Sequence, residues 1–274
     1  MKGIRSTASL RLLLFIALAG CATVQTTQPG AVGIQRKQTM LVSEASVEQG
    51  AEKAYASEVQ QAAAGGKLNG DPALTGRIRR ISGRLIPVTA AFRPDAPGWQ
   101  WEVNTLTTPE MNAYAMPGGK IMVYSGLVEK LQLSDGEIAA VLGHEISHAL
   151  REHARERVSR AYEQKVALLG FAVLTGVDPS ALDLADAVAS VTFQLPHSRE
   201  QEAEADVMGL ELMARAGYDP HEAISLWKKM MAAAQSSPPQ FLSTHPASAN
   251  RIAELERHIP QVMPLYQAAT SSNG

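Results

Sequence analysis

The chain has 274 residues, a formal net charge of −2 and a hydrophobic content of 45%. This length and composition suit one large globular domain or two small ones, with enough apolar residues for a real core. The near-neutral charge provides no basic patch or stripe of the kind that nucleic-acid binding needs, so we expect no nucleic-acid partner. We find no internal repeat that would indicate a solenoid or a propeller.

The N-terminus predicts a secretory signal. Three basic residues precede the short apolar run at 12–19, and small residues follow it. This run is far shorter than the roughly 20 residues of a membrane-spanning helix, which makes a simple membrane anchor the weaker alternative. Cys21, the only cysteine, ends the stretch "LAGC". This stretch resembles a bacterial lipobox, which implies cleavage before Cys21 and lipidation of that residue. Because Ala22 follows in place of Asp, the resemblance implies a periplasmic lipoprotein of the outer membrane.

The domain organisation follows from composition. Residues 22–38 are rich in Thr, Gln, Gly and Ala and lack periodicity, so we interpret them as a flexible tether. We therefore predict a signal peptide, a lipidated cysteine with its tether, one folded domain and a frayed tail, at residues 1–20, 21–40, 41–265 and 266–274. Lipidation would use the only thiol, so we expect no intrachain disulfide.

Two helical patterns and a β segment come first in the domain. Residues 43–63 and 73–90 have apolar residues at helical spacing, with a Gly-rich breaker between them. Residues 99–106 alternate as a strand does, and residues 112–127 read as strand, Pro-Gly-Gly turn and strand. Three strands predict a small, partly exposed sheet.

The rest of the chain is predicted to be helical. The stretch "SDGE" at 134–137 is a capping box, and the helix that it opens is expected to run to about residue 160. A second capping signature, "SREQ" at 198–201, opens a helix that ends near Gly217. The apolar stretch 166–177 is either a core helix or a lid. A last helix follows His245 and Pro246.

The stretch "VLGHEISHAL" at 141–150 predicts a metal site. His144 and His148 are four residues apart and therefore lie on one helix face, where two imidazoles can bind one zinc ion. Glu145 is rotated by about 100° from His144, so it can reach a water that the metal makes acidic and accept its proton. The alternative is a pair of solvated histidines. Because the surrounding residues are apolar, the helix should be buried, and buried histidines need partners.

A catalytic zinc ion takes three protein ligands, and the stretch "SREQEAEADVMG" at 198–209 can supply the third. Glu202 and Asp206 share one helix face, so Glu202 can bind the metal while Asp206 holds the free N–H of a ligand histidine. We expect Glu204, on another face, to be solvated; the alternative is an acidic helix without a metal. His153, nine residues after His144, is also predicted to be solvated.

These motifs resemble the M48 family of zinc metallopeptidases. The stretches that carry the resemblance are "HEISH", "EAEAD" read as E-x-x-A-D, the strand pair ahead of the active-site helix, and "THPASANRI" at 244–252. The resemblance covers roughly residues 40–260. It implies an α+β, mostly helical, zincin-like (gluzincin) domain with a small β-sheet whose edge strand borders the active-site cleft.

The resemblance also implies roles for individual residues. The zinc ligands would be His144, His148 and Glu202, and Glu145 would activate the water. The family places Asp206 behind the ligands, sometimes as a proton donor. Arg251 would orient Glu202, and His245 would stabilise the oxyanion or temporarily occupy the open zinc position. Asn112 would hold substrate backbone at the strand edge. Cys21 would carry the lipid.

Two functions from different classes follow. The first is a lipid-anchored zinc endopeptidase that cleaves unfolded or misfolded envelope proteins, which would add as an extra strand to residues 120–126. The second is a chaperone-like periplasmic lipoprotein that assists outer-membrane protein assembly, with the assembly machinery as a partner and with little or latent proteolysis. A purely structural zinc site is the third alternative, but such sites usually have four protein ligands, often cysteines.

Overall fold

The computed structural model describes residues 23–163, 184–235, 239–246 and 248–271. The signal peptide, the lipobox with Cys21 and the apolar stretch 166–177 lie outside these residues. No helix among the described residues is both long enough and apolar enough to span a membrane.

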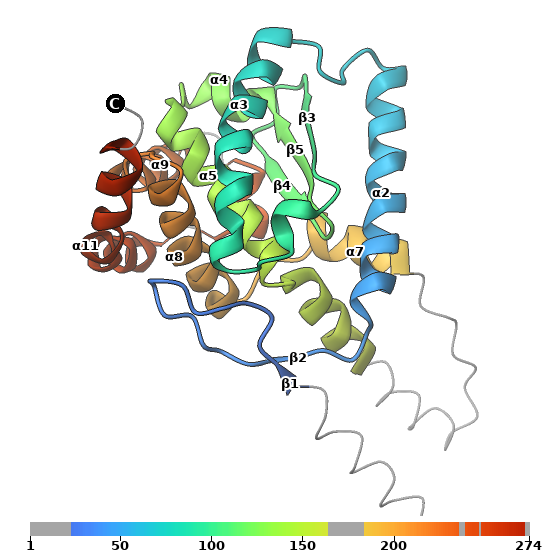
Figure 1. The fold of residues 1–274 in the computed structure, drawn as a ribbon. Helices are drawn as coiled ribbons and strands as arrows, with labels where there is room; N and C mark the ends of the chain where they lie inside the picture. The colour runs from blue at the N-terminus through green and yellow to red at the C-terminus, as the bar shows by residue number, and fades with distance from the viewer. Residues whose placement is uncertain (1–22, 164–183, 236–238, 247, 272–274) are drawn as a thin grey trace, which may run out of the picture.

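A three-stranded mixed sheet lies between two groups of helices (Figure 1). Strand β5 (Lys120–Tyr124) is central, with β3 (Glu102–Leu106) parallel on one side and β4 (Ala113–Met116) antiparallel on the other. The prediction that residues 120–126 form an exposed edge is therefore wrong, because β3 covers the second side of β5. The edge strand on the side away from β3 is β4.

Each face of the sheet has its own apolar core, because strand side chains alternate between faces. Helices α3 (Pro72–Val88) and α5 (Asp135–Leu150) cover the face that carries Ala113, Ile121 and Val123. Helix α2 (Glu44–Ala64) covers the opposite face, and α7 (Leu184–Phe193) packs against α2 there. The remaining elements are α4 (Ser125–Lys130), α8 (Arg199–Arg215), α9 (His221–Ala234), α10 (Phe241–Thr244), α11 (Ala249–Ser271) and the 3-10 turns η1 (Thr89–Ala91) and η2 (Ala96–Gly98).

Both predicted capping boxes are present. Ser134 opens α5 with Glu137, and Ser198 opens α8 with Gln201; in each box the serine accepts a backbone N–H and the partner side chain accepts the N–H of the serine. From Gly136 to Leu150 every residue of α5 is buried. Helices α5 and α8 pack closely enough that Gly143 and Gly209 touch. This crossing fixes the distance between the two predicted ligand helices.

Helix α5 is shorter than predicted. It ends at Leu150, and Glu152 takes a positive φ of 51°, after which residues 153–163 form a new helix. The prediction of one continuous helix to about residue 160 is therefore wrong. A left-handed residue turns the chain sharply, so the residues that follow return toward α5.

The predicted flexible tether is folded in its described part. Strands β1 (Thr23–Val24) and β2 (Gln38–Thr39) pair, and Thr27 and Gln38 are buried. Buried hydrogen bonds hold this segment; Gln38, for example, donates to the carbonyl oxygen of Arg151 over 2.7 Å. The prediction of a flexible tether is therefore wrong for these residues. Their polar side chains are ordered because they bond to buried partners.

The C-terminal helix is longer than predicted. Helix α11 continues through Ser271 and contains Pro260 and Pro264. The frayed tail expected from residue 266 is therefore wrong as far as Ser271. Leu255, Ile259 and Val262 are buried in the main core, and α11 packs against α8 and α9, so tertiary contacts stabilise a helix that two prolines would weaken.

Candidate metal centre

Four side chains from three segments meet in one buried cluster. His144 and His148 come from α5, Glu202 from α8, and His245 from the residue after α10. Each offers a ligand atom, and these atoms lie within 4.8 Å of one another. The two α5 nitrogens, His144 Nε2 and His148 Nε2, are 3.1 Å apart, and Glu202 Oε1 is 3.3 Å from His148 Nε2.

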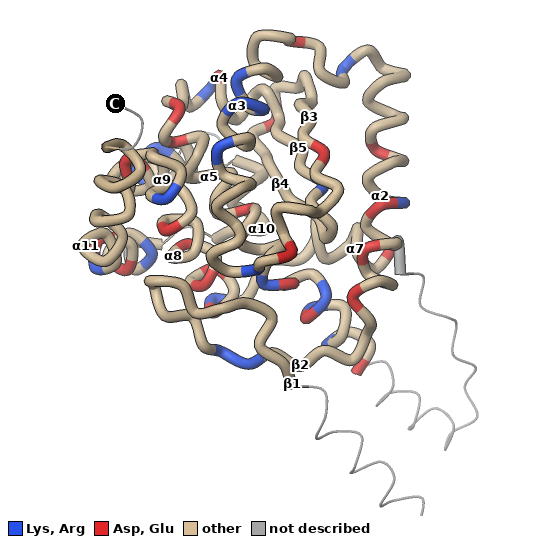
Figure 2. The backbone as a smooth tube through the Cα atoms, viewed as in Figure 1, with Lys and Arg blue, Asp and Glu red and all other residues tan. Residues whose placement is uncertain are grey.

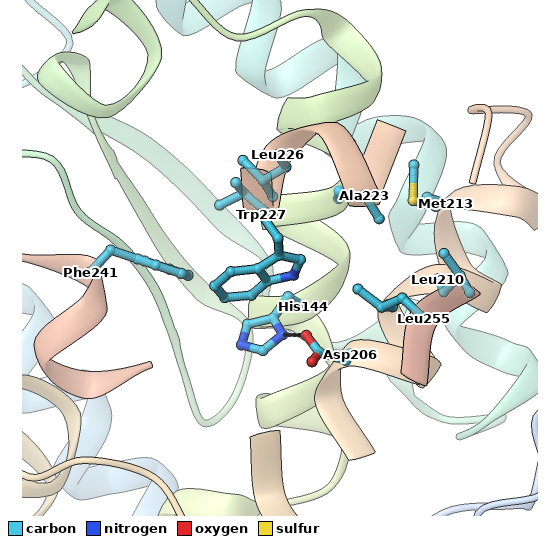
Figure 3. Close-up of a pocket in the computed structure, with 12 residues that line it drawn as sticks. His144, Asp206, Leu210, Met213, Ala223, Leu226, Trp227, Phe241 and Leu255 are labelled. Carbon is cyan, nitrogen blue, oxygen red and sulfur yellow. Dashed lines mark ion pairs between the residues drawn. The ribbon is translucent and has the colours of Figure 1, made fainter. Parts of the chain in front are cut away.

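His144 is held from behind by α8 and α9. Its Nδ1 lies 3.1 Å from Asp206 Oδ1, and its ring centroid lies 6.0 Å from that of Trp227. Figure 3 shows Asp206 and Trp227 beside the His144 ring. Arg251 donates to both Asp206 oxygens over 2.6 Å, and its Nη1 lies 2.6 Å from Glu202 Oε2. One guanidinium thus connects the Glu202 carboxylate of the cluster to the Asp206 carboxylate beside His144.

Glu145 lies beside the cluster, under the edge strand. It is buried, and together with Ala115 of β4 it lines one small cavity. Burial raises the pKa of the Glu145 carboxyl, and the charges of His245 and His144 oppose this rise. A raised pKa is the direction that a general base working near neutral pH needs.

His245 lies at the centre of the cluster. Its Nδ1 lies 3.0 Å from Glu202 Oε1 and 3.1 Å from His144 Nε2, and its Nε2 lies 3.4 Å from Glu145. Its ring stacks on Phe241, and the backbone N–H of His197 donates to the carbonyl oxygen of Thr244. These contacts fix the segment that carries His245.

His153 and Glu204 were both predicted to be solvated, and both predictions are wrong. His153 is fully buried, with its Nδ1 2.8 Å from His148 Nδ1 and its Nε2 3.0 Å from Glu204. The prediction for His153 assumed an unbroken helix, and the turn at Glu152 returns it beneath His148.

Glu204 is buried among arginines. Arg36 and Arg151 both donate to it, at 2.9–3.3 Å. Burial alone would raise the pKa of Glu204, but hydrogen bonds from His153, Arg36 and Arg151 lower it to about 2. Figure 2 shows charged residues of both signs gathered where the N-terminal segment passes the ends of α5 and α8.

Asn112 is not part of the cluster. It lies just before β4, where its carbonyl oxygen accepts from Tyr124 and its side chain accepts the N–H of Ala113. It borders a separate hollow of about 370 Å³ between α2, α7 and the start of α10. Asn112 therefore lies just before β4 and borders a different hollow from the one that Glu145, His148 and His245 line. His197 does approach the cluster, with its ring 4.0 Å from that of His148.

A metal cation fits this donor set. Burial lowers the pKa of His148 well below its usual value, so this ring is neutral and has a free nitrogen lone pair. Glu145 Oε1 is buried and has no hydrogen-bond partner within the described part of the chain. Neutral imidazoles and a carboxylate converging on one point are the ligands that zinc prefers. A cation would satisfy groups that are otherwise buried against one another.

Comparison with known proteins agrees with this geometry. The profile of "Peptidase family M48" matches residues 72–259. The mitochondrial metalloendopeptidase OMA1 of Schizosaccharomyces pombe is 36% identical over 186 residues, which is 67% of this chain and 52% of that protein. Human OMA1 is 32% identical over 189 residues, or 63% and 36%. The beta-barrel assembly-enhancing protease of Escherichia coli is 29% identical over 225 residues, or 76% and 43%. The chain thus spans about half or less of these relatives' lengths.

Proposed function

Since the chain belongs to peptidase family M48, we propose that it is a zinc endopeptidase that cleaves unfolded or misfolded proteins of the cell envelope. The observation that carries the proposal is the convergence of His144, His148 and Glu202 on one point, with Glu145 beside it. These three side chains would hold zinc. Zinc bound there supplies Lewis-acid chemistry, since it polarises the scissile carbonyl and makes a water molecule acidic.

Glu145 is proposed as the general base. It is buried, its pKa is raised, and its carboxylate lies beside the cluster, 3.4 Å from His245 Nε2. It would accept the proton of the attacking water and pass it to the leaving amine. Asp206 and Arg251 would hold His144 and Glu202 in position, because Arg251 pairs with Asp206, Asp206 lies 3.1 Å from His144 Nδ1, and Arg251 lies 2.6 Å from Glu202 Oε2.

The edge of β4 can bind an extended substrate. Because Tyr124 donates to Asn112 across β4 and β5, the register turns the backbone groups of Ala113 and Ala115 away from β5. An added strand there would run past Glu145, since Ala115 and Glu145 line the same cavity. Main-chain hydrogen bonding requires an extended backbone more than a particular sequence, which favours unfolded chains as substrates.

His245 supports a latent resting state. It lies within 3.1 Å of both His144 and Glu202, where an open metal position would be. The cavity beside Glu145, His148 and His197 is only about 20 Å³, which holds a water molecule and no peptide. We propose that His245 and the α7 side of this cavity move before substrate enters. The small size of this cavity and the position of His245 also favour the second candidate, a chaperone-like lipoprotein with rare cleavage.

The cellular location remains part of the proposal. The sequence "LAGC" ending at Cys21 supports a lipid anchor in the outer membrane. The Escherichia coli relative is a beta-barrel assembly-enhancing protease, and this similarity supports a link to outer-membrane assembly. The Schizosaccharomyces pombe relative, by contrast, is named a mitochondrial metalloendopeptidase.

The test offers the peptidase one substrate protein in two conformational states. The zinc-loaded full chain is incubated with a reporter protein, either native or permanently unfolded by reduction and alkylation, and fragments are counted by mass spectrometry. We expect cleavage of the unfolded form only, and faster cleavage by His245→Ala. Equal cleavage of both forms would refute the edge-strand account, and no cleavage by either enzyme would favour the chaperone-like alternative.

A further inference from the structure

The zinc ligand His148 is supported differently from His144. A carboxylate oxygen, Asp206 Oδ1, lies 3.1 Å from His144 Nδ1. Behind His148 the corresponding position holds a second imidazole, His153, with Nδ1 2.8 Å from His148 Nδ1. The carboxylate of Glu204 comes next, 3.0 Å from His153 Nε2. All members of this chain of contacts are buried.

The donors in this chain of contacts can be assigned. A nitrogen that binds a metal must present a lone pair, so His148 Nε2 carries no proton and His148 Nδ1 carries one. At 2.8 Å the facing atom, His153 Nδ1, must then accept. The remaining proton of His153 is on Nε2, where it donates to Glu204. One carboxylate therefore fixes the tautomers of two histidines in series.

Glu204 is itself fixed by the N-terminal segment. Arg36 donates to Glu204 through Nε and Nη2, and it pairs with Glu156 over 2.6 Å. Arg151 donates to Glu204 as well, and it also donates to Thr26 Oγ1, at 3.1 Å, and to the carbonyl oxygen of Arg36, at 2.9 Å. Residues 26–38 thus close over the carboxylate that ends the chain of contacts.

We propose that His153 and Glu204 are positioning residues that orient His148 toward zinc, and that residues 26–38 keep Glu204 in place. Partners of this kind orient a ligand ring and raise its basicity, and their loss typically weakens metal binding about 10- to 100-fold. The inference rests on the zinc site of the proposed function and is independent of the substrate. Through Glu204 and His153, residues 26–38, which follow the predicted lipidation site, would thus influence the metal centre.

The first measurement is zinc affinity of the purified full chain, by competition with a fluorescent chelator. His153→Phe fills the space without an acceptor and should raise the zinc Kd about 10- to 100-fold. His153→Asn keeps an oxygen near the position of Nδ1 and should recover most of the affinity. Glu204→Gln should weaken binding, whereas Glu200→Gln, an exposed acid on the same helix, should leave the Kd unchanged. The visible spectrum of the cobalt-loaded protein should change with His153→Phe and be retained with His153→Asn.

The second measurement needs no variant and decides the matter even if His153→Phe does not fold. In the zinc-loaded wild type, nitrogen NMR of labelled histidines should show a proton on His148 Nδ1 with a coupling across the hydrogen bond to His153 Nδ1. A proton on His148 Nε2, or a zinc Kd that is the same in wild type, His153→Phe and Glu204→Gln, would overturn the inference. A wild type that binds no zinc would overturn the proposed function instead.

Discussion

The crossing of α5 and α8 gives a sharp test of how the metal ligands are held. A Cβ added at Gly209 would lie 2.7 Å from the backbone nitrogen of His144 and 2.9 Å from the carbonyl carbon of Gly143. Both atoms belong to backbone, so the helices must separate for Gly209→Ala to fit. Alanine normally stabilises a helix interior by about 0.5–1 kcal/mol relative to glycine. Overpacking costs about 1–3 kcal/mol, so we expect a net loss of about 1–2 kcal/mol.

Because a loss of 1 kcal/mol lowers Tm by about 2–4 °C in a domain of this size, Gly209→Ala should lower Tm by about 2–8 °C. The zinc Kd should rise, since the substitution moves Glu202 away from His144. The control is Gly76→Ala in α3, where an added Cβ meets no atom within 4 Å, and this variant should be more stable than wild type. Equal or greater stability of Gly209→Ala with an unchanged zinc Kd would refute the reasoning.

Three further predictions concern the surroundings of the metal. The pKa of Glu204 in the folded protein is lowered to about 2 from 4.5, so this carboxylate stabilises the fold above about pH 5, and its contribution is lost as the pH falls toward 2. Urea titrations of Arg36→Met should therefore show a smaller loss of stability between pH 5 and pH 2 than those of the wild type. An equal loss in the two proteins would contradict the pairing of Arg36 with Glu204. Arg251→Lys cannot pair with Asp206 through two N–H groups while holding Glu202, so zinc affinity should fall about 10-fold, and a wild-type Kd would show that the guanidinium geometry is unimportant. Chelation should lower Tm, because it removes the stabilisation that bound zinc gives the folded state, about 4 kcal/mol at a free zinc concentration 1,000 times Kd. An unchanged Tm would exclude a bound metal in the folded protein.

The motif helices could be predicted because their signals are local. The four-residue spacing of His144 and His148 and the capping boxes at Ser134 and Ser198 depend only on helix geometry, and the structure has both helices. The three strands were predicted from alternation and a Gly-rich turn. Their order was not, because the parallel pairing of β3 with β5 joins segments that no turn connects.

The support of His148 could not be predicted, because it depends on one backbone residue. Glu152 adopts a left-handed conformation without the glycine or asparagine that would signal it, and this turn changes the position of His153 from solvent to core. The same holds for Glu204, whose partner Arg36 lies 168 residues away in a segment of polar composition. Local periodicity contains no information about such distant pairs.

The measurement that tests the central claim most directly pairs zinc content with turnover in the full chain and in Glu145→Gln. Native mass spectrometry counts bound zinc, and an unfolded protein substrate reports cleavage in the same samples. Since Glu145 is proposed to move a proton and not to bind the metal, both proteins should carry one zinc ion, and only the wild type should cleave, with turnover reduced at least about 100-fold in the variant. Equal cleavage by the two proteins, or a wild type that carries no zinc, would contradict the account.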